Sequence, residues 1–71
     1  MNIGDRIVQR YAGRTATSSH GIVEIVHVIK SINEINQTCD CELLEDNTYL
    51  TLRPGRIETL NFNYILKYLS L

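Results

Sequence analysis

The most hydrophobic stretch of the chain is residues 22–29, IVEIVHVI, in which β-branched side chains fill six of eight positions. Branching at Cβ restricts a side chain in a helix and suits the pleated surface of a sheet. Apolar side chains fall on both faces of this segment, which is typical of a central strand or of one that bends through a small barrel. We therefore predict a strand here, beginning after Gly21.

A shorter segment of the same character lies near the start of the sequence. Gly-Asp at residues 4–5 favours a turn, and the β-branched pair at residues 7–8 favours a strand that ends near residues 12–13. A polar loop at residues 14–21 separates this strand from the central one.

The middle of the sequence predicts a turn followed by a hairpin. Residues 33–37, NEINQ, are polar enough for a turn, and residues 38–44 alternate in hydrophobicity with a period of two. The expected inward-facing residues are Cys39, Cys41 and Leu43, and the outward-facing ones are Asp40 and Glu42. Glu-Asp-Asn at residues 45–47 is a second turn signal, which predicts antiparallel pairing of residues 38–44 with residues 48–52.

The last part of the sequence fits two patterns. Arg-Pro-Gly-Arg at residues 53–56 interrupts the preceding strand, because proline has no N–H group to donate. A helical face would contain the apolar residues Phe62, Ile65, Leu66 and Leu69. Residues 65–69 also alternate as a short strand does. We prefer a one-turn 3₁₀ segment at residues 61–64 followed by a strand at residues 65–69.

Three segments together resemble the SH3-like small barrel: GDRIV at residues 4–8, GIVEIV at residues 21–26 and LNFNYILKYL at residues 60–69. The resemblance implies an all-β fold of about five short antiparallel strands, with a one-turn 3₁₀ segment before the last strand, in a single domain spanning residues 1–71. The first two segments are also similar to those of small phage-encoded accessory proteins. That similarity implies a non-enzymatic module that binds and modulates a host protein.

Proline-rich peptides are not the expected ligand of this barrel. SH3 domains that bind them use an aromatic groove beside an acidic loop, whereas the loop here is basic and rich in hydroxyls, and the chain has no tryptophan. Tyr11 and Tyr64 lie where groove aromatics would fall. Fold alone does not determine function.

Composition limits the partners that the chain is expected to bind. Its 71 residues are 44% hydrophobic with a formal net charge of -1, so it should fold, but it lacks the cationic field that drives non-specific nucleic-acid binding. We therefore do not expect nucleic acid as a partner, whereas a protein partner or a homo-oligomer would help to stabilise so small a core. The sequence has no apolar run of membrane-spanning length and no signal-peptide core, so we expect a cytoplasmic protein with reduced cysteines.

The loop RTATSSHG at residues 14–21 is the first candidate binding site. Its functional groups are the guanidinium of Arg14, the hydroxyls of Thr15, Ser18 and Ser19, and the imidazole of His20. These donors could cradle an anion. The simpler interpretation, which we prefer, is a turn whose hydroxyls satisfy nearby backbone groups.

The second and third candidates are a basic patch and an apolar surface. Arg53 and Arg56 could form this patch with Arg10 and Arg14 if the two loops meet at one end of a barrel, where they would bind an anion or an acidic partner. Near the end of the sequence, Tyr68 and Leu71 are the residues expected to remain exposed as an interface.

Neither catalysis nor metal binding is indicated. No pattern places a base and an orienting carboxylate beside a nucleophile, and His27 lies in the strongest strand, where a neighbour is expected to satisfy it. Two cysteines separated by one residue do not have the spacing of a zinc site. We therefore expect a protein-binding module without a cofactor; the alternatives are a homo-oligomer that binds a nucleotide or other phosphorylated ligand, and weak nucleic-acid binding.

Overall fold

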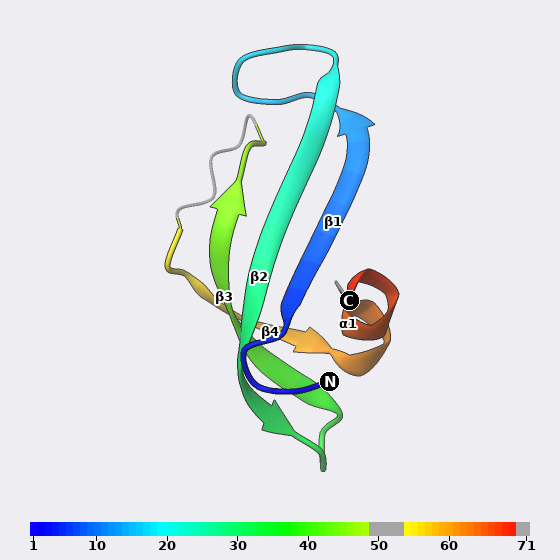
Figure 1. The fold of residues 1–71 in the computed structure, drawn as a ribbon, viewed down its shortest axis with the longest axis vertical. Coiled ribbons are helices and arrows are strands. Elements are labelled where there is room, and N and C mark those ends of the chain that lie inside the picture. The colour runs from blue at the N-terminus through cyan, green and yellow to red at the C-terminus, as the bar shows by residue number, and fades with distance from the viewer. Residues whose placement is uncertain (49–53, 70–71) are drawn as a thin grey trace.

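The computed structural model describes residues 1–48 and 54–69, which form one antiparallel sheet of four strands and a short helix. The elements are β1 (Arg6–Gly13), β2 (Gly21–Asn33), β3 (Thr38–Asp46), β4 (Ile57–Asn61) and α1 (Phe62–Tyr68). The strand order in the sheet is the order in the sequence, so each strand pairs with its neighbours along the chain (Figure 1).

Strand β2 runs through most of the length of the molecule, and irregular pairing with β3 lets the sheet coil. The register passes from the pair Val26–Glu45 to the pair His27–Leu43, which leaves Leu44 as an extra residue on β3. A second register shift lies nearer the other end of β2. Bulges of this kind bend a strand and increase its twist. As a result, β4 runs across the molecule below the upper half of the sheet and leads to α1 (Figure 1).

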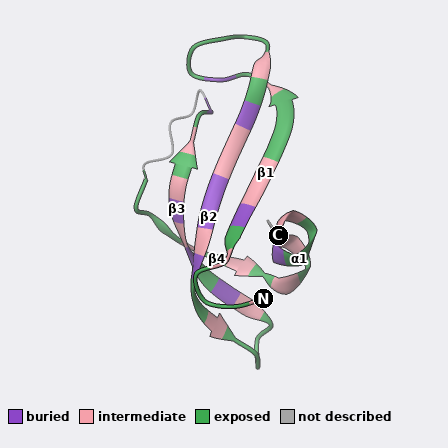
Figure 2. Ribbon diagram, viewed as in Figure 1, coloured by how far each residue is buried: buried purple, intermediate pink, exposed green. Residues whose placement is uncertain are grey.

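The core lies between the lower half of the sheet and α1. Its fully buried members come from every element except β4: Ile7, Ile29, Cys39, Cys41 and Ile65. Burying one large aliphatic side chain stabilises a fold by about 1.5–3 kcal/mol. Figure 2 shows the buried stretches in the middle of the strands, whereas the loop above β1 and β2 and the turn between β2 and β3 are mostly exposed.

Helix α1 corrects the expectation of a 3₁₀ turn at residues 61–64 and a strand at residues 65–69. Asn61 is its N-cap, and the Asn61 Oδ1 accepts a hydrogen bond from the Tyr64 N–H at 2.8 Å. The helix turns Ile65 into the core and leaves Leu66 61% exposed. After the helix, Leu69 forms an isolated antiparallel bridge with Ile7.

The predicted fold class is confirmed only in its coarser form, because the structure is mostly β. The expectation of about five strands in a closed barrel is wrong: the described residues form four strands in an open sheet. The reason is that the segment expected to supply the last strand is helical. Within the described residues, its backbone pairing with β1 is a single bridge, between Leu69 and Ile7.

The hairpin expected between residues 38–44 and 48–52 is corrected at its turn, which lies within the described part of the chain. The predicted turn at residues 45–47 does not form, because β3 continues through the bulge to Asp46 and pairs with β4 instead. Thr48 forms an isolated bridge with Thr15, and residues 49–52 lie outside the described residues.

Several local predictions are confirmed. The predicted central strand lies within β2, and the polar stretch before residue 38 contains the turn that joins β2 to β3. The alternation along β3 is also correct. Cys39, Cys41 and Leu43 are fully buried, while Asp40 is exposed and Glu42 is partly exposed.

Candidate functional site

The loop between β1 and β2 is a turn built around the hydroxyl of Thr15. That Oγ1 accepts hydrogen bonds from the backbone N–H groups of Ser18 at 3.1 Å and Thr17 at 3.4 Å, and it donates to the Ser18 carbonyl at 3.4 Å. The Ser18 hydroxyl donates to the carbonyl oxygen of His20 at 2.9 Å. The hydroxyls of Thr15 and Ser18 thus bind the loop's own backbone.

The remaining candidate residues of this loop do not form an enclosed site. Arg14, Ser19 and His20 are all exposed. A shallow hollow beside them is lined by His20 and by residues at the adjoining ends of β1 and β2, and its lining is mainly apolar. This geometry matches the interpretation of the loop as a structured turn.

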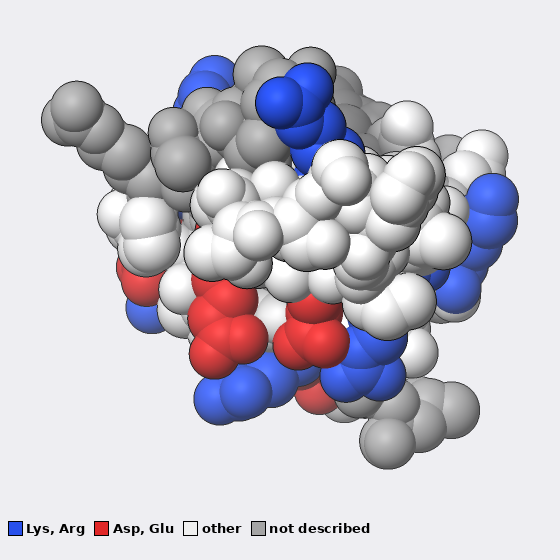
Figure 3. Space-filling model, turned by 90° about the horizontal axis from the view of Figure 1, so that it is seen from above, with Lys and Arg blue, Asp and Glu red and all other residues white. Residues whose placement is uncertain are grey.

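The cations among the described residues do not gather into a patch on the face that carries this loop. Seen from above, Lys and Arg side chains lie apart around the rim, with acidic side chains between them (Figure 3). Several cations pair with carboxylates, and the pairs are Arg10–Glu24, Lys30–Glu42 and Arg56–Glu58, with N–O distances of 2.7, 3.8 and 3.6 Å. Arg53 lies outside the described residues.

The imidazole of His27 is satisfied by a neighbour, as the sequence predicted. Its Nε2 lies 2.8 Å from the Oε2 of Glu58, and the His27 side chain is 4% exposed. Glu58 also lies 3.6 Å from the guanidinium of Arg56. The contact between His27 and Glu58 connects the central strand β2 to the edge strand β4, which gives His27 a structural role.

The two thiols are free, buried and weakly acidic. Burial, reinforced by the negative charge of nearby groups, raises the pKa of Cys41 to about 11. Burial and then the carboxylate of Asp40 raise the pKa of Cys39. Among residues 1–48 and 54–69, no three His, Cys, Asp or Glu side chains lie close enough together to hold a metal ion.

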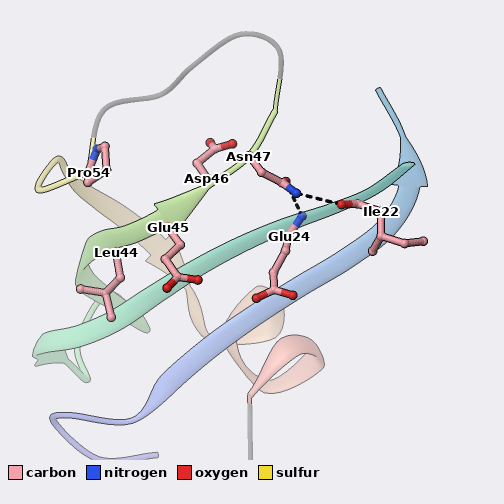
Figure 4. Close-up of a pocket in the computed structure, with 7 residues that line it drawn as sticks. All are labelled: Ile22, Glu24, Leu44, Glu45, Asp46, Asn47 and Pro54. Carbon is pink, nitrogen blue, oxygen red and sulfur yellow. Dashed lines mark hydrogen bonds between the residues drawn. The ribbon is translucent and has the colours of Figure 1, made fainter. Parts of the chain in front are cut away.

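An acidic hollow of about 540 Å³ opens beside the upper end of β3. It is lined by Ile22, Glu24, Leu44, Glu45, Asp46, Asn47 and Pro54 (Figure 4). The Asn47 side chain closes one end, since its Oδ1 accepts from the Glu24 N–H at 2.7 Å and its Nδ2 donates to the Ile22 carbonyl at 2.9 Å. This carboxamide prolongs the β2–β3 ladder beyond the end of β3.

A groove at the outer edge of β1 is the remaining candidate, and it contains the predicted interface residue Tyr68. It has a volume of about 330 Å³, and the residues that line it, Val8, Arg10, Lys67, Tyr68 and Leu69, are called the β1-edge groove below. The Lys67 ammonium lies 5.3 Å from the centre of the Tyr68 ring. Leu71, the other predicted interface residue, lies outside the described residues.

Beside the groove, helix α1 is fixed to the sheet by aromatic side chains. The Tyr64 hydroxyl donates a hydrogen bond of 2.7 Å to the Oε1 of Gln9 on β1, and the Tyr64 and Tyr68 ring centres lie 4.9 Å apart. Burial raises the pKa of the Tyr64 hydroxyl. The phenol therefore keeps its proton, and its ability to donate, to a higher pH than an ordinary tyrosine does.

Sequence reasoning identified Tyr68 but missed Val8, Arg10 and Lys67 as its neighbours. The groove forms because α1 ends against the outer edge of β1, where Leu69 meets Ile7. The available signal was Asn61, a strong N-cap residue before Phe62, which would have favoured the helix.

Comparison with protein-family models, curated proteins and solved structures found no match to this chain. No helix within the described part of the chain is long and apolar enough to cross a membrane.

Proposed function

We propose that the chain is a non-enzymatic protein-interaction module that binds its partner at the outer edge of β1. The supporting observation is the position of β1 as an edge strand. It has eight residues, and the only bridge on its outer side within the described chain is the one between Ile7 and Leu69. The remaining part of the edge, from Val8 to Gly13, offers backbone groups to another chain.

The other edge of the sheet is a weaker candidate. Strand β4 has five residues and is followed immediately by α1, so it offers a shorter run of backbone. Short edge strands are among the devices that reduce unwanted pairing. The β1 edge is both longer and adjacent to a groove.

Two further observations favour protein binding over the alternatives. The hydroxyls of Thr15 and Ser18 bind their own loop, which leaves fewer donors for a phosphorylated ligand. The dispersed cations argue against binding to nucleic acid. The resemblance of the opening segments to small phage-encoded accessory proteins supports a host protein as the partner that is modulated.

The test is native mass spectrometry of the protein purified from the cells that produce it, followed by hydrogen exchange on any complex. We expect a complex with a second, different protein, in which the amides of residues 8–13 exchange more slowly than in the free chain. A retained small molecule without a protein partner would contradict the proposal. Slower exchange confined to the loop at residues 14–20 would also contradict the assignment of the site.

A further inference from the structure

The backbone of β1 presents alternate residues to its open edge. The Ile29 N–H donates to the Asp5 carbonyl oxygen at 3.0 Å, so Asp5 faces β2. Residues along an antiparallel strand alternate in direction, so odd-numbered residues of β1 also face β2. The outward-facing residues are therefore Val8, which adjoins the bridge to Leu69, and Arg10 and Ala12 in the unpaired part. Glu24 on β2 supports this assignment, because its N–H donates to the Asn47 side chain and therefore points away from β1.

The side chains around this edge are cationic and lack a negative counterpart in their own elements. Strand β1 contains Arg6 and Arg10, helix α1 contains Lys67, and neither element contains Asp or Glu. The carboxylate that pairs with Arg10 is that of Glu24 on β2, whose Oε2 lies 2.7 Å from the Arg10 Nε, yet the Arg10 side chain remains 64% exposed. The local charge therefore favours an acidic occupant.

A second copy of β1 is a poorer occupant by the same reasoning. Pairing two β1 strands would bring the arginines of both copies together without a carboxylate from either strand. Cross-strand pairs of opposite charge are favourable, whereas like charges placed opposite each other are destabilising.

We infer that the partner contributes an extended acidic segment, which adds as a fifth strand to the β1 edge and places carboxylates beside Arg10 and Lys67. This inference rests on the proposed function and specifies the chemistry of its partner. The added segment begins above Leu69, which already occupies the position opposite Ile7. Backbone hydrogen bonds supply affinity, and the cations supply selectivity for acidic side chains.

The pleat of the sheet determines the sequence pattern of that segment. Every second side chain of the added strand lies on the face that carries Val8 and Arg10. The alternate side chains lie on the opposite face, which carries Tyr11, a residue that is 46% exposed. Carboxylates at every second position, with apolar side chains between them, satisfy both faces.

The probe that tests this inference is the peptide EVEVEVE, compared with KVKVKVK, added to the ¹⁵N-labelled chain. We expect the acidic peptide to shift the amide resonances of Val8, Arg10 and Ala12, and the basic peptide to leave them unchanged. The Arg10→Glu/Lys67→Glu double variant is expected to bind the acidic peptide at least about tenfold more weakly, as the loss of a charge-assisted contact predicts.

Two proline substitutions separate strand addition from simple attraction of charge. Ala12→Pro removes an outward N–H group from β1 without removing a bond to β2, which an edge strand tolerates. Its matched control is Ile57→Pro on β4, where the preceding Arg56 carbonyl accepts from the Leu43 N–H at 2.8 Å and Ile57 therefore faces outward. We expect Ala12→Pro to weaken binding about tenfold and Ile57→Pro to leave it unchanged. Thermal unfolding checks that both variants fold.

Each other outcome overturns the inference. An acidic added strand is excluded if the acidic peptide shifts no resonance of β1, or if the acidic and basic peptides shift them equally. It is also excluded if Ala12→Pro and Ile57→Pro change binding by the same amount. Dimerisation of the free chain through β1 in analytical ultracentrifugation, lost in Ala12→Pro, would identify a second copy as the occupant. If the peptide fails but the natural complex protects residues 8–13, the proposed function stands and only the acidic segment is wrong.

Discussion

The imidazole Nε2 of His27 lies 2.8 Å from the Oε2 of Glu58, and strand β3 separates the strands that carry them. The pair therefore connects the central strand β2 to the edge strand β4 across an intervening strand. Because His27 is buried, loss of its partner leaves a polar ring nitrogen without a hydrogen bond.

We expect Glu58→Gln to retain most of the stability of the fold, because an amide oxygen can still accept from the imidazole. Glu58→Ala should lower the free energy of unfolding by about 1–3 kcal/mol, the cost of an unsatisfied buried polar group. Urea unfolding measures both. Arg56→Ala is the control, because it removes only the exposed ion pair, and a loss as large as that of Glu58→Ala would show that His27 is not the important partner.

Asn47 gives a second prediction, since its side chain replaces backbone at the end of the β2–β3 ladder (Figure 4). Asn47→Ala should destabilise the fold by about 1–2 kcal/mol through the loss of two hydrogen bonds. The amide of Glu24 should then exchange its hydrogen faster. Asn63→Ala, an exposed change on α1, is expected to leave that exchange rate unchanged.

Thr15→Val tests the internal role of the loop hydroxyls. Valine keeps the shape of threonine but cannot accept from the Ser18 N–H, so we expect a loss of about 1 kcal/mol in the free energy of unfolding. Ser19→Ala in the same loop should change it little, because Ser19 is exposed. Equal losses in guanidinium unfolding would argue against Thr15 as the centre of the turn.

The raised pKa of Cys41 predicts a decrease in stability at alkaline pH. The folded chain holds the thiol proton up to about pH 11, whereas the thiol of an unfolded chain ionises near its usual value of 9.0. This thiol therefore leaves the stability unchanged below pH 9 and lowers it as the pH rises from 9.0 to about 11. Cys41→Ser should flatten this part of the profile in thermal unfolding, and an unchanged profile would assign the effect to other groups.

The parts of the fold that were predictable depend on neighbours in the sequence. Cys39 and Cys41 alternate with acidic residues, so their burial follows from the period of a strand. The turn residue Gln37 adopts a φ of 55°, which suits the short connection between β2 and β3. Both features are decided within a few residues.

The parts that were not predictable depend on tertiary contacts. The turn expected at residues 45–47 does not form, because Leu44 forms a bulge and the Asn47 side chain binds the backbone of β2. The N-cap Asn61 favours the helix locally, but the place of Ile65 in the core depends on packing between elements distant in the sequence. The β1-edge groove depends on α1 ending against β1 and on the order of the strands, which local patterns do not encode.

The meander order of the sheet has a consequence for how the chain folds. Hairpins between sequence neighbours close short loops at a small entropic cost, so β2 and β3, joined by a turn at residues 34–37, are suited to pair early. The bridge between Ile7 and Leu69 joins residues far apart in the sequence and is expected to form late. During synthesis, the β1 edge is therefore exposed before α1 docks against it, and the nascent chain can meet a partner at that edge before the core beneath it is complete.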